Sequence, residues 1–177
     1  MELHLNLPWR EHREVDWSAA AVSGLAAGAV LMVLELIWAA SMSGEGPWRI
    51  SQLIAALTLG AQVAQQAPPY AFDATVVTVA LVTHYVLGVL FGLALGFVIA
   101  RFHDGAHLGT MQTIGAAYGV ALYLINFYGV TLLFPWFVEL RGWSSFVVHL
   151  AFGVVASLLY WRLARRGGRA PRVAQVA

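Results

Sequence analysis

The chain contains four long stretches made almost entirely of Ala, Val, Leu, Ile, Phe and Gly, and no other feature constrains its fold so strongly. They cover residues 18–40, 74–100, 111–134 and 143–161. At about 1.5 Å of rise per residue, each stretch can cross a hydrocarbon core of about 30 Å as a helix. Of all residues, 60% are apolar and 11% are charged, whereas soluble domains have about 45–50% and about 25%. The sequence therefore predicts an all-α protein of the lipid bilayer, built as a bundle of four transmembrane helices.

Composition excludes several classes of function. Ten basic and nine acidic residues leave the chain nearly neutral, so it has no basic field with which to bind nucleic acid. There is no cysteine, which excludes disulfides, Cys-ligated zinc and thiol nucleophiles. The phosphate-binding glycine loops, nucleophile motifs and zinc-protease motifs of soluble enzymes are also missing. A non-catalytic membrane protein is therefore expected rather than an enzyme.

The arginines set the expected orientation, because basic residues are retained on the cytoplasmic side during membrane insertion. Only Arg49 and Arg141 lie on the side opposite to the two termini. The remaining arginines lie on the side of the termini: Arg10, Arg13, Arg101, Arg162, Arg165, Arg166, Arg169 and Arg172. We therefore expect both termini in the cytoplasm, with residues 1–17 as a cytoplasmic segment, 18–163 as the membrane domain and 164–177 as a basic cytoplasmic tail.

The segment 48–66, between the first two spans, has the pattern of an amphipathic helix. Apolar residues recur at helical spacing on one face, at positions 50, 53, 54, 57, 61 and 64. Polar residues fill much of the other face. We expect this segment to lie on the outer membrane surface as an interfacial helix.

The spans also indicate an internal repeat. An offset of 91 residues aligns the third span with the first, and an offset of 65 aligns the fourth with the second. The aligned residues include Gly24 with Gly115, Gly28 with Gly119, Glu35 with Asn126, His84 with His149 and Gly88 with Gly153. The two offsets differ by 26 residues (91 − 65), about the length of the amphipathic segment. The sequence thus predicts two helical hairpins as parallel repeats about an axis along the membrane normal, with the amphipathic helix inserted into the first.

Each span is interrupted in its interior by one strongly polar residue. These residues are Glu35, His84, Asn126 and His149. Counted from the cytoplasmic ends of the spans, all four lie roughly 20–27 Å deep, in the outer half of the bilayer. Because polar side chains are costly in lipid, they are expected to face the interior of the bundle. The sequence therefore predicts one buried polar layer.

Several interpretations of this layer are open. Two imidazoles, a carboxylate and an amide could ligate a transition metal such as Zn, Cu, Fe or Mn. The titratable groups could instead form a proton or ion pathway. His84 and His149 could also hold a b-type haem, although the glycine rows predict helices too close for a porphyrin. In the last interpretation, the layer only fastens the helices by hydrogen bonds, in a structural or accessory subunit of a membrane complex or in a homo-oligomer.

Polar residues outside the spans are weaker candidates. His103 and His107 lie four residues apart in the loop between the second and third spans, and we expect solvated side chains there rather than ligands. Glu139 and Arg141 follow the third span. They could pair as a surface salt bridge, or they could form the rim of an entrance to the polar layer.

The pattern of paired hairpins resembles a known kind of protein. A glycine-rich first span, Thr83-His84-Tyr85 in the second span, and His149 in the last span before a basic tail are similar to small, largely uncharacterised bacterial inner-membrane proteins of the YagU-like kind. Short four-span proteins often mislabelled as sodium:proline symporters are also similar. The resemblance covers most of residues 18–163 and implies a bacterial inner-membrane location and a link to acid stress. It carries over no catalytic residue.

Overall fold

The computed structural model describes residues 14–42, 44, 46–101 and 107–167. In these ranges the chain contains helices and no strand. The four longest helices are α1 (Trp17–Met42), α4 (Ala74–Arg101), α5 (Leu108–Leu124) and α6 (Trp143–Gly167). Four helical segments among the described residues are long and apolar enough to cross a membrane: Trp17–Ser41, Ala74–Arg101, Leu108–Leu132 and Trp143–Arg166. The prediction of an all-α bundle of four membrane-spanning helices is confirmed.

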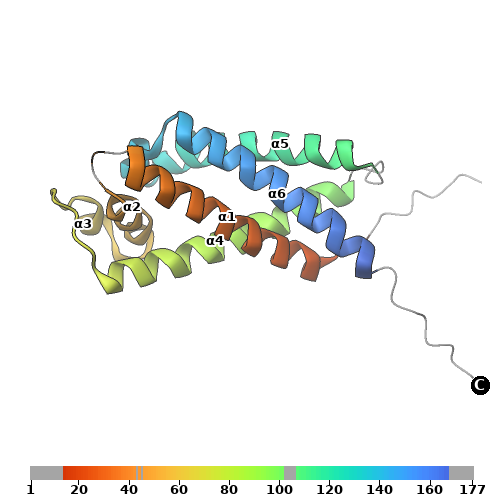
Figure 1. Cartoon of the computed structure of the whole chain (residues 1–177), viewed down its shortest axis with the longest axis horizontal. Coiled ribbons are helices and arrows are strands. Elements are labelled where there is room, and N and C mark those ends of the chain that lie inside the picture. The colour runs from red at the N-terminus through yellow and green to blue at the C-terminus, as the bar shows by residue number, and fades with distance from the viewer. Residues whose placement is uncertain (1–13, 43, 45, 102–106, 168–177) are drawn as a thin grey trace, which may run out of the picture.

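The long helices form two hairpins (Figure 1). α1 packs along α4, α5 packs along α6, and α1 also packs along α6, which joins the hairpins. α4 and α5 make few contacts, and they diverge from the end at which they are connected (Figure 1). α1 begins and α6 ends at this same end, which we call the terminal end. The opposite end, the cap end, carries α2 (Trp48–Leu59) and α3 (Ala61–Ala64).

Glycines bring the two backbones of each hairpin into contact. A methyl group on Gly24 of α1 would overlap the backbone of Gly88 and Gly92 on α4. A methyl group on Gly115 of α5 would overlap α6 in the same way, at Gly153 and Ser157. Such close approach lets helices pack by van der Waals contact inside a membrane. Because the offsets of 91 and 65 map the first set of positions onto the second, the hairpins make equivalent contacts, while their origin by duplication stays a prediction.

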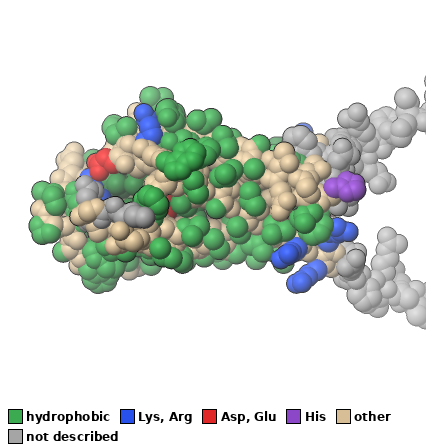
Figure 2. Space-filling model, turned by 45° about the horizontal axis from the view of Figure 1, so that its top comes forward, with side chains coloured by type: hydrophobic (Ala, Val, Ile, Leu, Met, Phe, Trp, Pro, Cys, Tyr) green, Lys and Arg blue, Asp and Glu red, His purple; other side chains and the backbone are tan. Residues whose placement is uncertain are grey.

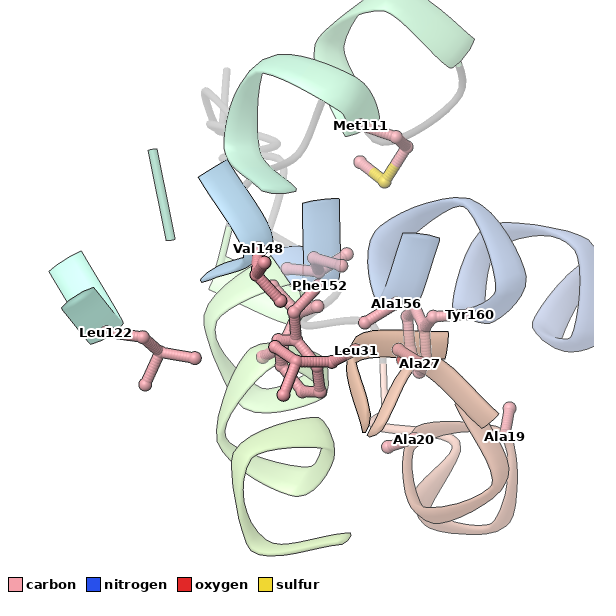
Figure 3. Close-up of a cluster of buried hydrophobic side chains, with 12 residues drawn as sticks. Ala19, Ala20, Ala27, Leu31, Met111, Leu122, Val148, Phe152, Ala156 and Tyr160 are labelled. Carbon is pink, nitrogen blue, oxygen red and sulfur yellow. The ribbon is translucent and has the colours of Figure 1, made fainter. Parts of the chain in front are cut away.

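The main hydrophobic cluster lies where the two hairpins meet (Figure 3). Ala27 of α1 and Ala156 of α6 are completely buried in it. Leu31 of α1 and Phe152 of α6 lie nearer the cap end, and Leu122 of α5 points toward them from the opposite side (Figure 3). Small residues fill the contact between α1 and α6, and larger ones fill the space where the helices diverge.

The third span changes helix type partway along. α5 ends at Leu124, and the chain continues through a π-helical turn, η1 (Ile125–Gly129), and a 3₁₀ turn, η2 (Val130–Leu132). The span 111–134 is therefore not α-helical throughout. The carbonyl oxygen of Phe127, inside the π turn, accepts hydrogen bonds from Arg141 at 3.0 and 2.6 Å and from Thr131 at 3.2 Å. These side chains satisfy a carbonyl at the end of the helix, where the α-helical partner is lost.

The cap end is closed by α2, α3 and a second 3₁₀ segment, η3 (Pro135–Leu140). The segment 48–66 is two helices rather than the predicted one, because Gly60 has a φ of +99° that ends α2. Leu53 and Ala56 of α2 are buried in a second hydrophobic cluster, which includes Val76 and Ala80 of α4. Thr58 is the one exposed residue of α2. α2 is therefore an integral part of the bundle, while its place at the membrane interface stays a prediction.

Charged side chains lie near the two ends of the molecule and leave a hydrophobic middle (Figure 2). Arg101 in the last turn of α4 and Arg165 and Arg166 in the last turn of α6 lie at the terminal end. Arg49 on α2 and Arg141 after η3 lie at the cap end. Among the described residues, the arginine distribution thus follows the pattern on which the predicted orientation depends.

Candidate functional site

The four polar residues of the spans line one cavity, which we call the inner cavity. Glu35 comes from α1, His84 from α4, Asn126 from the π turn η1 and His149 from α6. The cavity has about 630 Å³ of empty space when its open mouth is counted. The remaining lining is apolar apart from backbone. The predicted layer is therefore the polar wall of an otherwise apolar cavity.

His84 joins the two helices of the first hairpin. Its Nε2–H donates a hydrogen bond to the carbonyl oxygen of Gly28 on α1, at 2.9 Å. Because a carbonyl oxygen only accepts, Nε2 carries the proton and Nδ1 of the neutral ring is left with an acceptor lone pair. The imidazole lies close against α1 at this point, since a Cβ added to Gly28 would be in ordinary van der Waals contact with Nε2, at 3.8 Å.

His149 is held in a different way. Its Nδ1–H donates to the carbonyl oxygen of Ser145, one turn earlier on α6, at 2.8 Å. Its Nε2 accepts a hydrogen bond from Nδ2 of Asn126, at 3.1 Å. Both ring nitrogens are thus engaged, and the ring packs edge-on against Phe127 with centroids 5.2 Å apart. The two histidines, although aligned by sequence, use different hydrogen-bonding patterns.

Glu35 differs from the other three residues in its surroundings. Its side chain has no hydrogen-bond partner in the part of the chain that the structure describes. It lines the inner cavity and also two further cavities. One of these, the cap cavity, has about 790 Å³ of empty space and includes Arg49, Glu139, Arg141 and Ser144 in its lining. Glu35 thus lies between a polar cavity at the cap end and the cavity that holds the histidines.

The other cavity at Glu35 is on the side of the bundle, and we call it the side cavity. Its lining includes Met32, Ser51 and Val77 together with Glu35 and His84. It has about 600 Å³ of empty space and is almost wholly apolar. Glu35 and His84 are therefore shared by the inner and side cavities.

An ion pair fastens the cap. Arg49 of α2 donates to both carboxylate oxygens of Glu139 on η3, at distances of 2.7–3.1 Å. Arg49 also donates to the carbonyl oxygen of Ala64 at 2.8 Å and lies over the ring of Tyr70, 4.7 Å from its centroid. Its side chain is 9% exposed, whereas that of Glu139 is 44% exposed. The pair therefore joins α2, α3 and η3 over the polar layer.

Glu139 and Arg141 do not form the salt bridge that was one of the two interpretations of these residues. Glu139 forms its ion pair with Arg49. Arg141 instead donates to the Phe127 carbonyl and lies 4.1 Å from the centroid of the Tyr128 ring. Sequence reasoning missed Arg49, because its partner is 90 residues away. The one available signal was a single charged residue within an otherwise uncharged amphipathic segment. Glu139 and Arg141 do both line the cap cavity beside Glu35, the arrangement expected of an entrance rim.

The polar layer does not have the geometry of a metal centre in this structure. Among the described residues, no group of three or more His, Asp or Glu side chains is placed so that it could hold a metal ion. The Nε2 atoms of His84 and His149 are both hydrogen-bonded, so ligation through them would first require these bonds to break. Metal and haem binding by Glu35, His84, Asn126 and His149 stay hypotheses.

The loop histidines add no site. His107 precedes α5 and makes no capping hydrogen bond through its side chain. His103 lies outside the described residues.

Comparison of the chain with models of known protein families, with curated proteins and with solved structures found no match. The YagU-like resemblance therefore stays a prediction.

Proposed function

We propose that this integral membrane protein takes up and releases protons through its buried Glu/His/Asn/His layer, with Glu35 as the exchanging group. The observation that carries the proposal is the position of Glu35, which lines both the polar cap cavity and the inner cavity with the histidines. A carboxyl group in that position can exchange a proton with water on the cap side and pass it to a group inside. Titratable side chains at membrane depth mark such sites in other membrane proteins.

The orientation that goes with this proposal places the cap end outside. Arg101, Arg165 and Arg166 at the terminal end favour a cytoplasmic location for that end. Protons would then reach Glu35 from the outer side of a bacterial inner membrane. Such a location agrees with what the YagU-like resemblance implies, including its link to acid stress.

The charges around Glu35 come from the elements of the cap. Arg49 of α2 is largely neutralised by Glu139 of η3, and Arg141 lines the same cavity without a carboxylate partner among the described residues. From the other side, His84 of α4 and His149 of α6 face the inner cavity. Protonation of either histidine would favour an ionised Glu35, and protonation of Glu35 would favour neutral imidazoles. The layer is therefore expected to titrate as a coupled group.

The described residues support a site with access from one side rather than a pore. Toward the terminal end the helices are joined by contacts between glycine backbones, and the fully buried Ala20, Leu95 and Ala156 complete the apolar packing there. Buried Ser23 and Ser157 there bond to carbonyl groups of their own helices. No chain of polar groups in this part of the structure continues from His84 or His149 to the terminal end, so uptake and release would occur at the cap end.

Infrared difference spectroscopy tests the proposal. Protein in nanodiscs would be titrated from pH 4 to 9, and the carboxyl C=O band would be compared between wild type and Glu35→Gln. We expect one titrating band of the wild type to be missing in Glu35→Gln and to persist in Glu14→Gln, which changes an exposed residue before α1. Identical titration of wild type and a folded Glu35→Gln variant would overturn the proposal.

A second candidate function has its own observation. Each hairpin is joined by one polar contact of the layer, His84 to Gly28 in the first and Asn126 to His149 in the second. We also propose, as the alternative, that the layer only fastens the helices of a structural or accessory subunit. In that case, changes at His84 and His149 would lower stability and leave proton uptake unchanged, which separates the two candidates.

Metal binding is tested on the same variants. Elemental analysis of purified wild type beside the His84→Gln/His149→Gln double variant would show a bound metal as a stoichiometric loss, and an optical spectrum would show a haem. A metal or haem lost in the double variant would replace proton exchange as the leading function.

A further inference from the structure

The inner cavity has one polar wall and a longer apolar part. Away from the polar residues it is lined by Leu31, Leu87, Phe91, Leu122 and Phe152. Its cap end is covered by apolar residues of α2 and η3, including Ile54 and Phe137. Water gains little from such a lining, because an apolar cavity offers few hydrogen-bond partners. An apolar molecule, in contrast, gains from burial there.

Two of the helices that line the cavity, α4 and α5, make few contacts with each other. α1 packs on α4, α1 on α6 and α5 on α6, whereas α4 and α5 make few contacts and diverge toward the cap end (Figure 1). Toward the terminal end, α4 and α5 are joined by the hydroxyl of Tyr118, which donates to the carbonyl oxygen of Phe91 at 2.7 Å. Leu87 and Phe91 on one side of this gap and Asn126 on the other are only half-buried. A molecule dissolved in the bilayer could therefore enter between α4 and α5.

The polar wall offers acceptors of hydrogen bonds. Because His84 donates through Nε2, its Nδ1 is an acceptor. Because Asn126 donates through Nδ2, its Oδ1 is an acceptor, and the carboxyl group of Glu35 has no partner among the described residues. The wall thus presents more acceptors than donors to a molecule in the cavity.

The charges select against an anionic molecule. No arginine lines the inner cavity, and Arg49 and Arg141 line the cap cavity instead. A carboxylate or phosphate in the inner cavity would have no arginine among the lining residues to compensate it, and a buried uncompensated charge is strongly unfavourable. A cationic head would also lose its hydration, with Glu35 as its one possible counter-ion. A neutral hydroxyl group, which donates one hydrogen bond, avoids both losses.

We propose that the inner cavity binds an amphiphilic molecule from the bilayer, with an apolar body and a neutral hydroxyl or phenol head that donates a hydrogen bond to the Glu35, His84 and Asn126 wall. The inference goes beyond proton exchange and does not depend on it, since it stands on the cavity and its acceptors. Burial of the apolar body supplies the driving force, and the acceptor wall sets the preference for the head group.

Photolabelling tests the site directly. The probe is a 4-alkylphenol with a diazirine on its chain, added to the protein in nanodiscs, with the labelled positions mapped by mass spectrometry. We expect labels on Leu87, Phe91 and Leu122 that an excess of unlabelled alkylphenol removes. The methyl ether of the probe lacks the donor, so we expect it to label these positions about tenfold less.

A matched pair of variants on α4 controls for partitioning into lipid. Leu87→Trp puts an indole into the cavity, whereas Leu90→Trp puts it on the same helix at a position that is 53% exposed. We expect the first to lose specific labelling and the second to keep it. If Leu87→Trp does not fold, Leu122→Trp replaces it. If neither variant folds, the comparison of phenol and ether labelling on wild type decides alone.

Three results would overturn the inference. The first is labelling spread evenly over lipid-facing positions such as Leu90 and Leu124. The second is equal labelling by phenol and ether. The third is a preference for an alkylammonium or alkylcarboxylate probe over the phenol. Glu35→Gln removes the carboxyl group, so the titrating carboxyl band should disappear. Because the variant keeps a polar side chain, it should still bind the phenol. Failure of this inference is therefore distinguishable from failure of the proposed function.

Discussion

The imidazole of His84 donates from Nε2 to the carbonyl oxygen of Gly28 at 2.9 Å and thereby joins α4 to α1 next to the glycine contacts of the first hairpin. His84→Phe removes this bond and keeps an aromatic ring of similar size. Because hydrogen bonds between membrane helices contribute about 0.6–2 kcal/mol, we expect the free energy of unfolding to fall by about that amount. Unfolding in mixed micelles measures it. His107→Phe, at an exposed residue before α5, is the control and should change it little.

The glycine contact of the first hairpin should tolerate no side chain. A methyl group at Gly24 would overlap α4 backbone, which cannot move as a flexible side chain could. We expect Gly24→Ala to lower the free energy of unfolding by about 1–3 kcal/mol through overpacking. Gly109→Ala, at an exposed position of α5 with nothing within 4 Å of the added methyl, should instead stabilise by about 0.5–1 kcal/mol. Equal effects of the two changes would contradict the packing described.

The ion pair between Arg49 and Glu139 should hold the cap closed. Glu139→Gln leaves Arg49 with its contacts to the Ala64 carbonyl and the Tyr70 ring. Because the side chain of Glu139 is 44% exposed, we expect the free energy of unfolding to fall by only about 1 kcal/mol or less. Locally, amide hydrogen exchange in α2 and α3 should become faster. Protection in α5 and α6 should be unchanged. Unchanged exchange in α2 would mean that hydrophobic packing alone holds the cap.

Asp16 should make the start of α1 sensitive to acid. Its carboxylate accepts from the backbone N–H of Ala19 at 2.9 Å and from the hydroxyl of Ser18 at 2.7 Å. The Ala19 hydrogen bond first, and then that of Ser18, lower the pKa of Asp16 below its ordinary value, against a smaller opposite effect of burial. A lowered pKa means that the ionised carboxylate stabilises the fold. This contribution is fully present above the unfolded-state pKa of about 3.9 and is lost as the pH falls through the folded-state pKa.

Comparison with Asp16→Ala measures this contribution. We expect wild type to be more stable than the variant at pH 7, with a difference that shrinks below about pH 4. A stability difference that is constant from pH 7 to pH 3 would contradict an ionised Asp16 as the N-cap. Asp73, which bonds to the backbone N–H groups of Thr75 and Val76 before α4, offers a second helix start for the same comparison.

The sequence was sufficient to predict the four spans and the residues of the polar wall. Span length and composition are local properties that depend on the bilayer thickness, so no partner had to be known. Glu35, His84, Asn126 and His149 could be grouped because each is the one strongly polar residue in the interior of its span, and burial away from lipid leaves little choice of direction. Their similar depth predicted that they lie in one layer, and all four line the inner cavity.

The arrangement around that wall could not be predicted in the same way. The pairing of Arg49 with Glu139 depends on the fold of two segments far apart in the chain. No Pro marks the π turn at Asn126 within the span, and the Phe127 carbonyl in this turn is bound by Arg141, which lies beyond η3. Helical periodicity gave the faces of α2, but it could not show that the bundle, rather than the lipid surface, covers Leu53 and Ala56.

Access to position 35 tests the central claim most directly. Because the chain has no cysteine, single cysteine variants can be labelled without background. Glu35→Cys would be treated with a membrane-impermeant thiol reagent in spheroplasts, which expose the outer side, and in inverted vesicles, which expose the inner side. Gly44→Cys, exposed after α1, is the accessible control, and Ser23→Cys, at a residue that is fully buried, is the inaccessible one. We predict that Glu35→Cys reacts from the outer side alone, like Gly44→Cys. Reaction from the inner side, or no reaction from either side in folded protein, would contradict a polar layer that exchanges protons through Glu35 at the cap end.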